Sequence, residues 1–133
     1  MVTLKESVYQ TLRDDAVAEI GLHTLLGKAS MPYGVYWLSP PKTPSFPIIT
    51  YFINAQTKSD LSREIPFNIT SWGSDFVAIL DRVYTLLHDK SITVTDYGFV
   101  KLLYDWSSPE LFDENFKVYF RQDRFLATGI RSI

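Results

Sequence analysis

The clearest pattern along the chain is a helical stripe of apolar residues in its second half. These residues recur three or four positions apart: Phe76, Ile79, Leu80, Val83, Leu86 and Leu87. Because polar residues occupy the opposite side, the segment predicts an amphipathic helix from about Ser74 to Leu87 that packs on the core. Ser74 is the predicted N-cap, since its hydroxyl can accept a backbone N–H of the first turn.

A second helical stripe lies at the start of the chain. Apolar residues at every fourth position, Leu4, Val8 and Leu12, predict a helix over about residues 3–13. Asp15 is the predicted N-cap of a following short helix that carries Val17 and Ile20 and can extend to Leu25 and Leu26. Two glycines within and after this segment predict that the second helix is short or broken.

The remaining apolar runs have the short length and alternation of strands. They predict strands over residues 33–38, 48–53, 65–72, 92–94, 99–106 and 116–121, followed by a short tail over 127–133. Four prolines between Ser39 and Pro47 predict a stiff, extended connector. The order of helices and strands favours one α+β domain over residues 1–133. We expect an antiparallel sheet with the long helix and the N-terminal helix packed on it.

A polar segment from Asn54 to Glu64 separates two of these predicted strands. Hairpin connections usually have about 2–5 residues, so this loop is longer than the turn requires. Its charged residues form the candidate partner-contact site: Lys58, Asp60, Arg63 and Glu64. The alternative is a solvated hairpin that only connects the strands.

The composition limits the chemistry that the chain can perform. It has no cysteine, so disulfides and thiolate chemistry are excluded, and a zinc site would need His23 and His88 with carboxylates. His88 lies at the end of the long helix, where a hydrogen-bonding ring suits the unpaired carbonyls. Asp14, Asp15 and Asp75 are interpreted as helix caps and dipole complements. With neither a nucleophile elbow nor a glycine-rich phosphate loop, we expect no enzyme, no cofactor and no metal.

Charge and hydropathy bear on the partners. The formal net charge of −2 lacks the basic excess that is typical of a free-standing nucleic-acid binder. The N-terminus lacks the basic and then apolar order of a signal peptide, and no apolar run approaches the roughly 20 residues that span a bilayer. We therefore expect a soluble protein without a membrane partner.

Several motifs follow one another in a characteristic order. The opening helix covers residues 4–15, and Phe46-Pro47-Ile48-Ile49-Thr50-Tyr51 places a proline before a strand that ends in tyrosine. Residues 67–72 form a strand that ends in tryptophan directly before the long helix, and residues 116–121 form the closing strand. In this order and spacing, over nearly the whole chain, the sequence resembles the tail-terminator or tail-completion (head-to-tail joining) family of long-tailed bacteriophages and prophages.

The resemblance implies a structural, late protein of the virion that is assembled in the cytoplasm of the bacterial host. Such a protein forms a hexameric ring that caps the tail tube, ends tube polymerisation and provides the surface for joining the head. Its partners would be other copies of itself, the tail-tube protein and the head-completion or connector protein. DNA would pass through the ring without sequence-specific binding.

Two alternatives remain open at this point. A head-completion or adaptor protein of the phage neck would have a similar size and fold class. A small ligand-binding module would instead have a deep aromatic-lined pocket with convergent polar groups.

Overall fold

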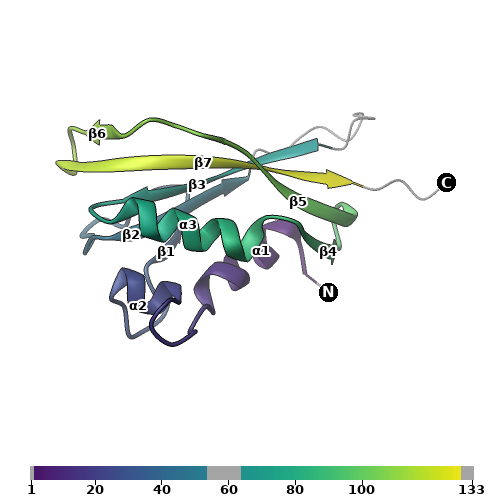
Figure 1. The fold of residues 1–133 in the computed structure, drawn as a ribbon, viewed down its shortest axis with the longest axis horizontal. Coiled ribbons are helices and arrows are strands. Elements are labelled where there is room, and N and C mark those ends of the chain that lie inside the picture. Colours follow the sequence, from purple (N-terminus) through teal and green to yellow (C-terminus); the bar gives the residue numbers. More distant parts are fainter. Residues whose placement is uncertain (1, 54–63, 130–133) are drawn as a thin grey trace.

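A seven-stranded sheet forms the frame of the molecule, and three helices cover one of its faces (Figure 1). The computed structural model describes residues 2–53 and 64–129. The strands are β1 (Val35–Trp37), β2 (Ile48–Ile53), β3 (Glu64–Trp72), β4 (Lys90–Val94), β5 (Gly98–Ser107), β6 (Leu111–Asp113) and β7 (Val118–Gly129). They lie in the order β1-β2-β3-β7-β5-β4, with β6 also paired to β7. The α+β class is confirmed.

The sheet is mixed, so the prediction of a purely antiparallel sheet was wrong. β1 runs parallel to β2, with Val35 opposite Ile49, and the other pairings are antiparallel. The cause lies in the proline-rich connector over residues 38–47. This connector, which bends at several residues, carries the chain back along β1, so that β2 begins at the same end as β1.

The long helix α3 (Phe76–Leu87) packs on the sheet as predicted. Its buried residues are Ile79, Leu80, Val83 and Leu87. The predicted cap was wrong, because Asp75 occupies the N-cap position with φ 66° and makes no side-chain cap. Tertiary contacts hold this turn instead: the N–H of Gly73 donates to the carbonyl of Tyr119, and a Cβ on Gly73 would lie 3.2 Å from the backbone of Pro47.

Helix α1 (Leu4–Arg13) confirms the prediction at the N-terminus. It buries Leu4, Val8 and Leu12, and the Thr3 hydroxyl caps it by accepting the N–H of Glu6. No helix in the described part of the chain is long and apolar enough to cross a membrane.

The second helix lies later in the sequence than predicted. Helix α2 spans Leu22–Leu26, while Val17 and Ile20 lie before it and are 49% and 56% exposed. Asp15 does not start a helix at its own position. Its buried carboxylate accepts the N–H of Leu22, the first residue of α2, and also binds Arg82 of α3. The ion pair with Arg82 thus holds the Asp15 carboxylate beside the start of α2, seven residues further along the chain.

The last strand is twice as long as its apolar alternation indicated. β7 pairs with β3 along its length and with β5 at its C-terminal half, so residues 127–129 belong to the sheet and not to a tail. The polar run from Arg121 to Arg124 hid this continuation. In the structure, Asp123 is buried in a hydrogen-bonded cluster and Gln122 lies on the face of the sheet away from the helices.

Candidate functional site

The predicted contact loop lies almost entirely outside the described residues. Lys58, Asp60 and Arg63 belong to that part, and the structure makes no statement on them. Glu64 is described, and it is the first residue of β3, exposed and opposite Thr128 of β7. The loop boundary at Glu64 was therefore wrong, because the sheet pairing of β3 with β7 continues to that residue.

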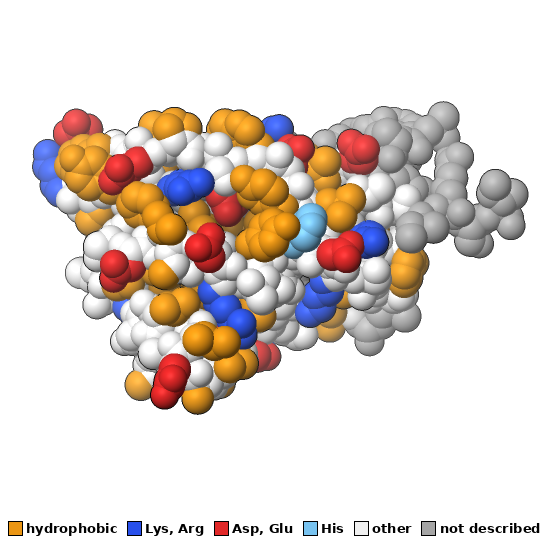
Figure 2. Space-filling view, viewed as in Figure 1, with side chains coloured by type: hydrophobic (Ala, Val, Ile, Leu, Met, Phe, Trp, Pro, Cys, Tyr) orange, Lys and Arg blue, Asp and Glu red, His pale blue; other side chains and the backbone are white. Residues whose placement is uncertain are grey.

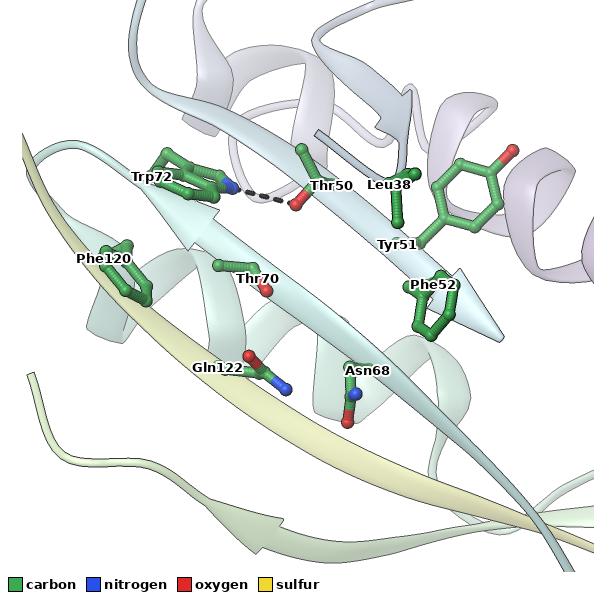
Figure 3. A pocket seen from close by; sticks show the side chains of 9 residues that line it. All are labelled: Leu38, Thr50, Tyr51, Phe52, Asn68, Thr70, Trp72, Phe120 and Gln122. Carbon is green, nitrogen blue, oxygen red and sulfur yellow. Dashed lines mark hydrogen bonds between the residues drawn. The ribbon is translucent and has the colours of Figure 1, made fainter. Parts of the chain in front are cut away.

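The face of the sheet away from the helices carries a shallow hollow of about 280 Å³ (Figure 3). Trp72 defines one end, where its indole N–H donates to the Thr50 hydroxyl at 2.8 Å and its ring stacks on Phe120 with centroids 4.7 Å apart. Asn68 and Gln122 add amides from the two central strands. None of the lining residues is an acid, a lysine, an arginine or a histidine. Tyr51 is a titratable residue of the lining, and burial raises its pKa to about 12. This face can therefore stack and hydrogen-bond.

A second hollow, of about 300 Å³, lies between α3 and strands β5 and β7, on the face that Figure 2 shows. Asp123 lies there with 4% of its surface exposed, and burial raises the pKa of its carboxyl. Ser107 donates to Asp123 at 2.7 Å and its hydroxyl also contacts that of Tyr104. The Nε of Arg121 is buried and has no hydrogen-bond partner in the described structure.

This polar cluster lacks the arrangement of a nucleophilic hydrolase. A reactive serine needs a base that takes its proton and a third group that orients the base, and a histidine most often supplies the base. Ser107 bonds to Asp123 and Tyr104, and the two histidines lie elsewhere, against the backbone of Arg13 and of Tyr104. The expectation of no enzymatic activity stays a prediction.

Both histidines have structural contacts. Nδ1 of His88 accepts the N–H of Tyr104 in β5 at 3.0 Å, and its ring stacks on Tyr84. The position of His88 in the sequence had suggested a contact with the helix carbonyls. In the structure the His88 ring instead binds strand β5. His23 contacts the carbonyl of Arg13 and stacks on Tyr33. Among the residues that the structure places, no three of the histidines, aspartates and glutamates gather as a metal site would require.

We expect Asp123→Asn to stabilise the protein at neutral pH. The folded protein holds the Asp123 proton more tightly than the unfolded chain, so wild-type stability falls as pH rises through the folded pKa. The amide stays neutral, and its oxygen can still accept from Ser107. The gain should vanish below about pH 4, where the Asp123 carboxyl is protonated in both the folded and the unfolded chain. Melting temperatures from pH 3 to 8 test this. Asp105→Asn, at an exposed pair with Arg124, is the control, and an equal gain there would contradict the prediction.

A group of exposed apolar side chains was missed by sequence reasoning. It lies where β6 pairs with β7 and where β5 ends: Trp106, Leu111, Phe112 and Tyr119 are 43–53% exposed. Phe112 and Tyr119 pack edge to face, 4.9 Å apart. Figure 2 shows hydrophobic side chains at the surface in this region, at the upper left of the view. The register places Leu111 opposite Phe120 and Phe112 opposite Tyr119, so these exposed side chains project from both faces of the sheet edge. Scattered exposed apolar residues are normal, and an exposed apolar edge is a candidate interaction surface.

Comparison with known proteins yields a fold match. No family model matches the chain, and no curated protein matches its sequence. Its fold is similar to that of a chain in the virion of a native gene transfer agent (GTA) particle, with a TM-score of 0.70 and 20% sequence identity. The match covers 96% of this chain and 94% of that chain. The two proteins therefore share one fold over nearly all of both chains, at low sequence identity.

Proposed function

We propose that this chain is a structural protein of a phage-like virion and that it forms the ring that ends the tail tube. The observation that carries the proposal is the fold match, which leaves almost no part of either chain unmatched. The sequence motifs that resemble the tail-terminator family occur in order along the same residues. The two hollows support this assignment over a ligand-binding module, because the smaller one has no charged lining residue and Asp123, Ser107 and Tyr104 of the larger one are bonded to each other.

A ring suits the chemistry of the surface. Cyclic assemblies use heterologous contacts, in which one patch of each subunit meets a different patch of the next. The exposed apolar side chains along the edge at β5, β6 and β7 would supply one such patch. A weak contact of this kind becomes strong when the end of a tube aligns several copies at once, because each further copy then binds at a high effective concentration. The ring is proposed to be hexameric, as the resemblance implies.

The proposed position at the end of the tail tube implies the partners. One face of the ring would bind the tail-tube protein and the other the head-completion or connector protein. DNA would pass through the opening. The formal net charge of −2 favours passage over retention, because proteins that hold DNA through its phosphates need clustered lysines and arginines.

Removal of the gene from the element that encodes it is the decisive experiment. We expect electron microscopy of the particles to show tubes of uncontrolled length and heads without tails. The wild-type gene supplied in trans should restore tails of one length joined to heads. If the double variant His23→Ala, His88→Ala folds, it should also restore joined tails of one length, because no catalytic step is involved. Tails of normal length that fail to join heads would contradict termination and identify a neck adaptor.

A further inference from the structure

Charged residues are unequally distributed between two segments of the chain. Residues 20–53 contain Lys28 and Lys42 and no acidic residue. Residues 102–116 contain four acidic residues and no lysine or arginine: Asp105, Glu110, Asp113 and Glu114. The first segment includes β1 and β2, and the second includes most of β5 and all of β6. The two segments therefore differ in charge, although Arg124 and Lys117 pair with two of the acidic residues and the Lys28 ammonium donates to the carbonyls of Leu26 and Pro47.

The two segments lie at opposite edges of that sheet. β1 is the first strand in the order and pairs only with β2 among the described strands. β6 pairs with β7 on one side, and β4 covers β5 only from Gly98 to Leu102. The outer edge of β6 and of the end of β5 thus has no neighbouring strand in the described ranges. Figure 1 shows β6 and β1 well apart, with β7, β3 and β2 between them.

The edge at β1 is basic and carries exposed apolar side chains. The ammonium of Lys5, on α1, lies over the ring of Trp37 in β1, 3.9 Å from its centroid. Lys42 is exposed in the connector that follows β1. Met31 and Leu38 flank the strand and are 59% and 57% exposed. We call this surface the basic edge.

The edge at β6 has the opposite charge. Its exposed apolar residues Trp106, Leu111 and Phe112 lie within the second segment, and Tyr119 lies opposite Phe112 on β7. Arg124 neutralises Asp105 and Lys117 lies 3.5 Å from Glu114, while Glu110 is exposed and has no ion-pair partner in the described structure. We call this surface the acidic edge.

We propose that the acidic edge of one copy binds the basic edge of the next copy. Each edge joins apolar area to charges that complement the other, which favours association and sets its direction. Because the two patches differ and lie at opposite edges of one sheet, the contact is heterologous, and repeated copies close into a ring when the rotation between them allows it. The inference rests on the proposed ring and identifies the surfaces that build it.

Cross-linking tests the contact, and the chain suits this test because it contains no cysteine. The double variant Leu38→Cys, Leu111→Cys places one thiol on each edge. A short bismaleimide is preferred to oxidation, since a disulfide demands a narrow geometry. We expect a ladder of covalent oligomers from the purified chain or from assembled particles, and none from either single variant. The matched control is Phe99→Cys, Leu111→Cys, because Phe99 is 45% exposed but lies outside the basic edge.

Charge reversal gives a second readout. Glu110→Lys and Lys42→Glu should each reduce the yield of the ladder, because like charges then meet. The two reversals in one chain should restore it, because every contact again joins opposite charges. Rising salt should lower the yield of the original pair, since exposed charges are screened.

Three results would overturn the inference: no ladder in either preparation, an equal ladder from the control pair, or cross-links from Leu111→Cys to the tail-tube protein only. The proposed function would survive these results if removal of the gene still changes tail length. Loss of that dependence would instead refute the proposed function, even where copies cross-link through these edges.

Discussion

Asp15→Ala is expected to lower the free energy of unfolding by about 3–5 kcal/mol, because it leaves a largely buried arginine without its partner. The Asp15 side chain is 2% exposed, and both of its oxygens accept from Arg82 at 2.8 Å. It also accepts the N–H of Leu22. One carboxylate thus connects the segment after α1, the start of α2 and the middle of α3. Chemical denaturation of the purified variant measures the loss.

The neighbouring aspartate is a matched control. Asp14 also binds an arginine with both oxygens, but its side chain is 58% exposed. Asp14→Ala should therefore cost less than about 1 kcal/mol, because water replaces a surface partner. Equal losses from the two substitutions would show that burial of the Asp15 pair contributes nothing to stability.

The Asp15 pair also predicts a dependence on pH. Burial opposes ionisation, but the hydrogen bonds from Arg82 and Leu22 outweigh it and lower the pKa of Asp15 below its ordinary value. A lowered pKa contributes stability above the unfolded pKa of about 3.9, and this contribution is lost as pH falls through the folded pKa. The difference between wild type and Asp15→Ala should therefore shrink in acid. A constant difference from pH 7 down to pH 2 would contradict this.

Leu80→Ala is expected to cost about 2–5 kcal/mol, because it removes buried methyl groups and leaves a cavity between α3 and the sheet. Leu80 is 4% exposed. Val77 lies one turn earlier on the same helix and is 57% exposed, so Val77→Ala should change stability by no more than about 0.5 kcal/mol. Thermal and chemical unfolding of both variants measure the two values. A Leu80→Ala protein as stable as wild type would show that α3 does not anchor the core.

The candidate surfaces illustrate what sequence reasoning can reach. The length of the charged loop from Asn54 to Glu64 indicated a partner-contact site, and this role stays a prediction. The acidic bias over residues 102–116 was equally readable in the sequence. The sequence alone did not connect this bias with a surface, because strand order cannot be read from it. Only the fold shows that this segment lies at one edge of the sheet and that the segment with Lys42 lies at the other.

The sequence by itself determined the helices that pack on the sheet. Leu4, Val8 and Leu12 form one stripe and the apolar residues of α3 another, and both periodicities survive in the fold because each is a property of neighbouring turns. The strand over Ile48–Ile53 was equally clear, since a short apolar run needs burial on the sheet.

The tertiary structure decided the features that depend on distant partners. The start of α2 depends on Asp15 and Arg82, which are 67 residues apart. The direction of β1 depends on the path of the connector to β2, and the length of β7 depends on pairing with β3 and β5. The physical reason is common to all three. Local periodicity records which face of a segment is apolar, whereas strand pairing and buried ion pairs are free-energy gains that exist only after the chain has brought remote residues together.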